Sequence, residues 1–290
     1  MIAASGATAN AGASPAPRTR LVINADDFGI SPAVNAGILE AHAAGTVSST
    51  SMMVHCPGWD DAGRTIRSAP GLGVGLHLNL LVGAPIIAGV TSVDRRTGRF
   101  LSLSALVRRA LAGRLDAGEI EAECEAQVAA VERLGVRFTH IDSHRHTHAL
   151  PVVRRAVARV AARRGVPLRR PVESHRRFPN DVISQIHRGV IAWSWRVTSL
   201  GAPETRAPDY FIGVSMQGGE RFEAQLAHVL DRLPAGSVEL MVHPGRVDAA
   251  LSAVDGYTWQ RERELAALTS PAVRDRLRRG DIALVRFSEL

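Results

Sequence analysis

The patterned part of the chain begins with the run Leu21-Val22-Ile23-Asn24-Ala25-Asp26-Asp27-Phe28-Gly29. Its apolar residues predict a buried strand that ends in two adjacent carboxylates and a glycine. Ser31-Pro32 follows and has the pattern of a helix start, with a capping serine and proline in the first position. In α/β enzymes the carboxyl ends of such strands carry catalytic groups. We therefore expect Asp26 and Asp27 to lie at the mouth of the functional site.

Outward from this run, strand and helix patterns alternate to the end of the chain. About eight strands separated by helices predict parallel pairing through right-handed crossovers. We expect a single α/β domain over residues 19–290, a (β/α) barrel that is TIM-like in a regular or an irregular form. A doubly wound open sheet is the alternative. Further strands are predicted at residues 46–54, 73–80, 138–142, 166–172, 208–214, 237–243 and 282–287.

Two segments carry other local signals. Gly73 and Gly75 fall inside a predicted strand and indicate close approach of another part of the chain. Residues 85–100 combine proline, glycine and charge without a clear period, which is typical of an inserted functional loop. We expect this loop to lie over the mouth of the barrel.

The composition limits the classes of function. The chain has 290 residues, a formal net charge of +7 and 35 basic residues, all of them arginine, but only 4% aromatic residues. Its arginines lie on predicted helix faces between alanine and valine, which favours a solvated surface over nucleic-acid binding. No apolar run reaches the roughly 18 residues of a membrane span.

The N-terminal residues and the two cysteines bear on the location of the protein. Residues 1–18 are rich in Ala, Ser, Gly and Pro and lack the pattern of a signal peptide, so we expect a disordered leader. Cys56 and Cys124 do not make a disulfide framework and are expected to be reduced, which fits a cytoplasmic location. A homodimer is compatible with the sequence, which does not fix the oligomeric state.

Histidines follow three later strands of the prediction. They are His77, the run His140-Ile-Asp-Ser-His144-Arg-His146-Thr-His148, and His243. A lone histidine on a strand is more often a core residue, but in a barrel these would meet the Asp26–Asp27 pair at one end. Carboxylate and imidazole groups are suitable ligands for a divalent metal that activates water. Neighbours on an extended chain point apart, so one aspartate would bind the metal and the other would face the water. The alternative for the pair is a turn or a helix cap.

The remaining candidates have weaker signals. Asp142 could orient a metal-binding histidine, or cap a helix. His243 precedes Pro-Gly, which suits a rigidly held general acid, although a histidine in this position, seen alone, more often stabilises a turn. If the run from His144 to His148 is extended, its three histidines share one side. Arg169 and Arg170 could hold a substrate oxygen, or form a surface salt bridge.

Four motifs together resemble the YdjC-like carbohydrate deacetylase family, which includes chitooligosaccharide deacetylases and hopanoid-associated proteins. They are Ala25-Asp-Asp-Phe-Gly29, Gly75-Leu-His-Leu-Asn79, His140-Ile-Asp-Ser-His-Arg-His-Thr-His148 and Leu240-Met-Val-His-Pro-Gly245. They occur in the family's order and span nearly the whole chain.

The resemblance implies a barrel enzyme that removes acetyl from an N-acetylated sugar with one divalent metal ion, Zn or Mg, Mn, Co or Ni. By position it implies that Asp27, His77 and His144 bind the metal. Asp26 corresponds to the general base and His243 to the general acid, with His148 as a helper. Asn79 and Arg170 are assigned to substrate binding.

Two other classes remain open. A metal-dependent phosphoesterase would favour more bridging carboxylates than this chain offers. A non-catalytic sugar-binding protein would need no general base. The substrate itself stays open between a chitooligosaccharide, a glycosylated hopanoid lipid and another N-acetylated glycan.

Overall fold

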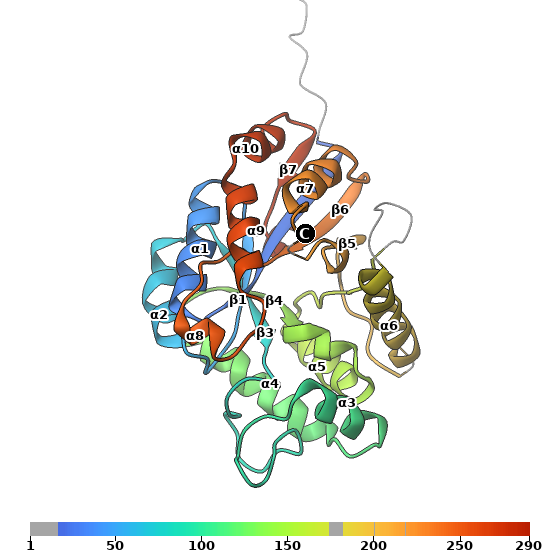
Figure 1. Cartoon of the computed structure of the whole chain (residues 1–290). Coiled ribbons are helices and arrows are strands. Elements are labelled where there is room, and N and C mark those ends of the chain that lie inside the picture. Colours follow the sequence, from blue (N-terminus) through green and yellow to red (C-terminus); the bar gives the residue numbers. More distant parts are fainter. Residues whose placement is uncertain (1–16, 174–181, 200, 218) are drawn as a thin grey trace, which may run out of the picture.

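The computed structural model describes residues 17–173, 182–199, 201–217 and 219–290 (Figure 1). The leader expected at residues 1–18 therefore lies almost entirely outside the described residues.

A curled sheet of parallel strands forms the centre of the fold. Its order is β4 (Phe138–Ser143), β3 (Gly73–Leu78), β2 (Ser49–Met52), β1 (Thr19–Phe28), β6 (Gly236–Val242) and β5 (Tyr210–Ile212), and β7 (Ile282–Leu284) pairs with the start of β1. Strand β1 thus lies between the second strand and the sixth. This cyclic strand order is typical of a barrel. In a doubly wound sheet the order of the strands would reverse beside β1. The expected parallel α/β architecture is confirmed.

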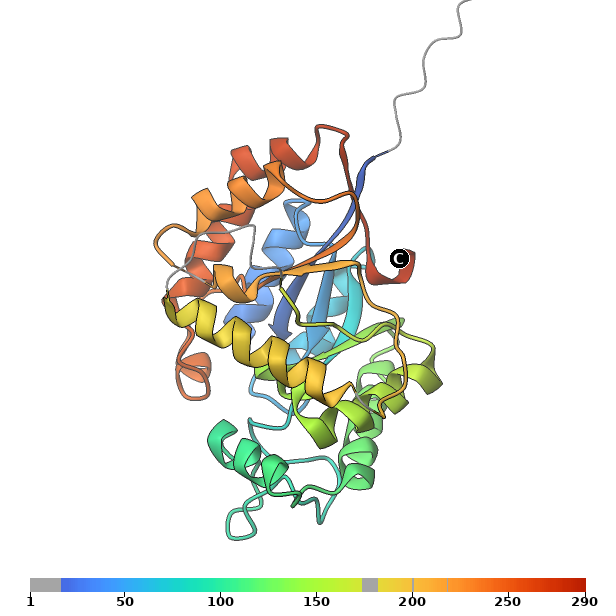
Figure 2. The same ribbon diagram turned by 90° about the vertical axis from the view of Figure 1, so that its right-hand side faces the viewer.

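Helices surround the sheet on its outer side (Figures 1 and 2). Helix α1 begins as predicted, with Pro32 in the first turn and the Ser31 hydroxyl accepting from the Val34 amide at 3.2 Å. The helices are α1 (Pro32–Ala43), α2 (Trp59–Thr65), α3 (Leu103–Leu111), α4 (Ala117–Glu132), α5 (Pro151–Arg164), α6 (Val182–Thr198), α7 (Phe222–Asp231), α8 (Ala249–Ser252), α9 (Trp259–Thr269) and α10 (Pro271–Leu277).

The sheet is incomplete between β4 and β5. The strand expected at residues 166–172 does not form: this segment makes one isolated bridge, from Leu168 to Ile141, and the next residue, Glu173, makes another to Phe211. The described residues therefore form a curled, barrel-like sheet and not eight regular strands. The segment contains Pro167 and Pro171, which lack the amide hydrogen that a strand interior requires.

One predicted close approach is confirmed at Gly75. A Cβ atom at this position would lie 2.4 Å from Cε1 of His140. The His140 ring in turn stacks on Phe287, with 3.9 Å between ring centroids. The His140 side chain is thus fully buried, and it is part of the core and not of the functional site.

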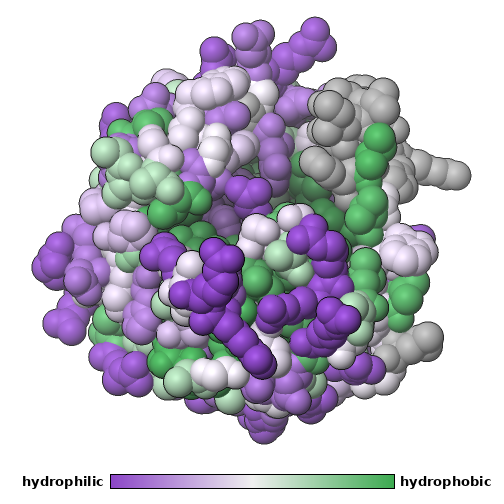
Figure 3. Space-filling model, turned by 60° about the horizontal axis from the view of Figure 1, so that its bottom comes forward, coloured by the Kyte–Doolittle hydropathy of each residue, from purple (hydrophilic) through white to green (hydrophobic). Residues whose placement is uncertain are grey.

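The arginine-rich surface is used for contacts between helices. Arg159, Arg163 and Arg164 on α5 form ion pairs with Glu121, Glu125 and Glu132 on α4. Figure 3 shows hydrophilic and hydrophobic side chains interspersed on one face of the molecule, without a continuous hydrophilic stripe. Among the described residues, every helix is too short or too polar to cross a membrane.

Candidate active site

The carboxyl ends of β1, β3, β4 and β6 surround a cavity of about 380 Å³. It is lined by Asp26, Asp27, His77, Ser143, His144, Arg145, His146, Gln217, Met241, His243, Asp255, Gly256, Tyr257 and Arg261. The Asp pair and the histidines from three later strands therefore meet at one mouth. Residues 85–100 contribute nothing to this lining; their amides bind Glu119 and Glu123 of α4 instead.

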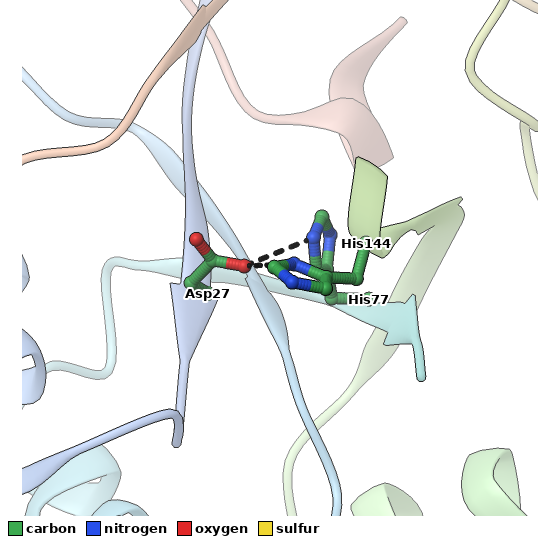
Figure 4. A group of neighbouring side chains, drawn as sticks. All are labelled: Asp27, His77 and His144. Atoms are coloured by element: carbon green, nitrogen blue, oxygen red, sulfur yellow. Dashed lines mark hydrogen bonds and ion pairs between the residues drawn. The ribbon is translucent and has the colours of Figure 1, made fainter. Parts of the chain in front are cut away.

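Asp27, His77 and His144 converge on one carboxylate oxygen (Figure 4). Oδ1 of Asp27 lies 3.1 Å from Nε2 of His77 and 2.9 Å from Nδ1 of His144. The three candidate ligand atoms lie within 4.8 Å of one another, and all three side chains are buried. One carboxylate oxygen and two imidazole nitrogens form a donor set that suits a divalent transition metal.

A second group, Asp26, His77 and Asp142, is equally compact. It is the poorer candidate for a metal site, because Arg169 already binds both oxygens of Asp26 and Oδ2 of Asp142. Asp142 also lies outside the cavity lining. The Asp27 group opens to the cavity, where a substrate could reach it.

The backbone at Asp27 explains how two neighbouring carboxylates face the same cavity. On a regular strand they would point to opposite sides. Asp27 instead has a φ of 72°, in the left-handed region that non-glycine residues rarely adopt. This conformation cancels the alternation of side chains, and both Asp26 and Asp27 line the cavity. Strained backbone of this kind often marks a functional site.

Asp26 is held by a two-pronged ion pair. Its Oδ2 and Oδ1 atoms lie 2.6 and 2.7 Å from Nη1 and Nη2 of Arg169, and Asn24 donates to Oδ1 at 2.8 Å. Burial alone would raise the pKa of Asp26, but the charges of Arg169 and His77 outweigh burial and hold this pKa well below its ordinary value. Asp26 is therefore ionised at neutral pH.

His77 is oriented by a carboxylate behind it. Its Nδ1 lies 2.7 Å from Oδ1 of Asp142, and Asp142 also accepts from the Ser51 hydroxyl at 2.9 Å. With its proton on Nδ1, neutral His77 turns an unprotonated Nε2 toward Asp27. Burial would lower the pKa of His77, but Asp142 and Asp26 raise it to about 10. Nε2 of His77 and Oδ1 of Asp27 therefore need either a proton or a cation between them.

His243 lies next to Asp26 in the cavity lining. Its Nε2 is 4.0 Å from Oδ2 of Asp26, and its backbone amide donates to Glu264 at 2.6 Å. The Tyr257 hydroxyl donates to the other oxygen of Glu264, and the Tyr257 ring packs against His243 at 5.4 Å between centroids. Glu264 and Tyr257 together fix the position of the His243 ring.

The histidine run after β4 is a tight turn and not an extended segment, which corrects the expected geometry. Residues His144–Ala149 form a 3₁₀ turn in which Arg145 and His146 have left-handed backbone. His144 reaches Asp27 and His146 lines the cavity. His148 points elsewhere: its Nδ1 bonds the Ser143 hydroxyl, and its Nε2 lies 3.2 Å from the backbone oxygen of Arg169. With both nitrogens engaged, His148 has no free atom to offer a substrate, so we do not retain it as a catalytic helper.

The two residues expected to bind substrate lie outside the cavity lining. Asn79 is fully buried, and its side chain forms hydrogen bonds with the backbone of the loop that follows it. It donates to the backbone oxygen of Val82 at 2.8 Å and accepts from the amide of Val82 at 2.9 Å. Arg170 is exposed and donates to the backbone oxygen of Asp209 at 2.7 Å. Its neighbour Arg169 enters the site, as the partner of Asp26.

Sequence reasoning missed Arg261. Its Nη2 lies 2.6 Å from Oδ2 of Asp27 and 2.8 Å from Oδ2 of Asp255, and its side chain is fully buried. Burial would raise the pKa of Asp27, but Arg261 and His144 outweigh burial and hold it well below its ordinary value. Arg261 lies on α9 in an ordinary charged helix pattern, Gln-Arg-Glu-Arg-Glu, so no local signal distinguishes it.

Comparisons with known proteins identify the family of the chain. The profile described as YdjC-like protein matches residues 20–279. Curated relatives named carbohydrate deacetylase include one from Brevibacillus brevis, 34% identical over 93% of this chain and 99% of the relative, and one from Geobacillus stearothermophilus, 33% identical over 92% and 96%. A crystal structure from Enterococcus faecalis, described as a candidate cellobiose-phosphate cleavage protein, matches with a TM-score of 0.76 and 27% identity over 94% of this chain and 99% of that one. The chain belongs to the YdjC-like protein family.

Proposed function

We propose that this protein is a metal-dependent hydrolase that removes the acetyl group from an N-acetylated sugar, in an oligosaccharide or a glycolipid. The observation that carries the proposal is the convergence of His77 and His144 on one oxygen of Asp27, at the floor of an open cavity that also holds Asp26 and His243. The names of the curated relatives support a carbohydrate substrate.

Asp27, His77 and His144 would hold the metal ion. Asp142 supports this role, because it keeps the Nδ1 proton of His77 in place and leaves Nε2 as a ligand. A bound divalent metal would polarise the acetamide carbonyl and bring the pKa of a bound water toward about 7. The donor set favours zinc or another transition ion.

Asp26 and His243 would move the protons. Ionised Asp26 accepts a proton from the attacking water, and Arg169 keeps its carboxylate aimed at the cavity. His243 donates a proton to the departing nitrogen, which as an amide nitrogen is otherwise a poor leaving group. Nε2 of His243 and Oδ2 of Asp26 lie 4.0 Å apart, so both can reach one acetamide group that binds beside them in the cavity.

The test is acetate release from N-acetylglucosamine oligomers and from N-acetylated glycolipids, with and without a chelator. We expect release that stops on chelation and returns when a divalent metal is restored. Phosphate release from phosphorylated sugars without acetate release would indicate a phosphoesterase. Sugar binding without turnover of any substrate at saturating metal would contradict an enzymatic function.

Two further properties of the protein remain proposals. Cys56 and Cys124 are both buried and unpaired, which supports the expected cytoplasmic location, where thiols stay reduced. A homodimer would be tested by light scattering or sedimentation of the purified protein.

A further inference from the structure

A second pocket shares no lining residue with the active-site cavity. It has a volume of about 730 Å³ and lies between α5, the end of α6 and the segment 202–207. Its charged lining consists of Arg154, Arg170, Arg206 and Glu204. Three guanidinium groups and one carboxylate give this lining a net charge of two positive units.

Arg154 is the unusual member of this set, because its charge is buried without a counter-charge. Its side chain is 8% exposed and lies over the ring of Trp195, with 3.3 Å from Cζ to the ring centroid. Nη1 makes a long contact of 3.4 Å to the backbone oxygen of Trp195, and Nε has no hydrogen-bond partner. Arg154 forms no ion pair with any carboxylate of the described residues.

The two fully buried arginines of the described residues both form ion pairs. Arg169 binds Asp26, Asp142 and Glu239, and Arg261 binds Asp27 and Asp255. Burial of an unpaired charge is unfavourable, and it lowers the pKa of Arg154 to about 10. Arg154 differs from Arg169 and Arg261 in that no carboxylate of the described residues pairs with it.

Arg170 and Arg206 add donors from two other segments. Arg170 bonds the backbone oxygens of Pro208 and Asp209, and Arg206 bonds that of Gly165. Neither forms an ion pair in the part of the chain that the structure describes. These backbone contacts hold the two guanidinium groups at the pocket while leaving several N–H groups free to donate.

We propose that this pocket binds a phosphate group, either as inorganic phosphate or as the phosphate of a small phosphorylated compound. Three guanidinium groups from separate segments suit an anion with several acceptor oxygens, and arginine binds phosphate with two parallel hydrogen bonds. A phosphate next to Arg154 would supply its missing counter-charge. The pocket volume exceeds that of a phosphate ion, and Ala202, Pro203 and Ala207 offer apolar walls for the rest of a larger ligand.

The proposal is tested by titration calorimetry of the metal-loaded protein at constant ionic strength, with sodium phosphate, glucose 6-phosphate and glucose. We expect saturable binding of a phosphate-containing probe and none of glucose. Binding should weaken at least tenfold in Arg206→Gln, which changes an exposed side chain, and in Arg154→Met. Arg155→Gln is the matched control, since Arg155 is the exposed neighbour on α5 outside the pocket.

The two phosphate probes separate the sources of the group. Equal affinities would show that the phosphate alone is recognised, and tighter glucose 6-phosphate binding would assign the apolar walls to the rest of the ligand. Absence of saturable binding, or equal binding by wild type and Arg206→Gln, would overturn the proposal. So would binding that disappears with a chelator, because it would locate the phosphate at the active-site metal.

Discussion

Asp26→Asn tests the assignment of the general base. Asparagine keeps the shape of the side chain and one acceptor oxygen but cannot take up a proton. General acid–base catalysis contributes about 10²–10⁴-fold, and each tenfold change corresponds to about 1.4 kcal/mol of activation free energy. We therefore expect kcat/KM to fall by 10²–10⁴-fold, which is about 3–5 kcal/mol. Asp27, His77 and His144 are untouched, so the metal content should stay at the wild-type level.

The same substitution also disturbs Arg169, and a control must separate this effect from catalysis. Arg169 keeps Asp142 and Glu239 as partners in Asp26→Asn, so we expect a loss of about 1.5–3 kcal/mol in the free energy of unfolding. Glu239→Gln removes a different carboxylate from the same guanidinium, at 2.6 Å from Nε, and lies outside the cavity lining. It should lower kcat/KM by less than about tenfold.

The assay is acetate release under kcat/KM conditions, with metal measured by elemental analysis and unfolding followed in urea. Near wild-type turnover by metal-loaded Asp26→Asn would refute the base assignment. An equal loss of activity in Glu239→Gln would show that the position of Arg169, and not the proton acceptor, accounts for the effect.

Three further outcomes are expected. His77→Ala should lose most of its bound metal in elemental analysis while remaining folded by circular dichroism; full metal retention would exclude His77 as a ligand. Arg261→Met leaves the charge of Asp27 without its 2.6 Å partner, so the free energy of unfolding should fall by about 3–5 kcal/mol in urea titrations, and a change below about 1 kcal/mol would contradict a structural ion pair. Gly75→Ala adds a Cβ that would lie 2.4 Å from the buried ring of His140, so it should destabilise by about 1–3 kcal/mol, whereas Gly189→Ala on α6, with open space around it, should be neutral or stabilising by up to about 1 kcal/mol.

The sequence predicted the parts of the site that depend on strand order. Asp26, Asp27, His77 and His243 each lie at or just after the carboxyl end of an apolar run, and parallel strands bring these ends together. His144 follows by the same reasoning, from β4. This logic needs only the positions of strands along the chain, which hydrophobic patterning supplies.

What the sequence did not predict depends on backbone angles and on long-range pairing. The left-handed backbone of Asp27, Arg145 and His146 redirects their side chains. None of the three is a glycine, so the residue types do not indicate this conformation. The same turn separates His146, which faces the cavity, from His148, which bonds Arg169. Arg261 belongs to the site only because α9 packs beside α1, more than two hundred residues from Asp27.

The position of β1 also has a consequence for how the chain folds. Strand β1 is the first described element, yet along Thr19–Ala25 it pairs with β6, whose residues begin at Gly236. A chain still being synthesised therefore carries a finished apolar strand with one edge unpaired until four-fifths of its length has been made. Non-local pairing of this kind slows folding and exposes strand edges to other chains. Truncations that end before Gly236 should accumulate as aggregates, and early association with a chaperone would protect the edge of β1 during synthesis.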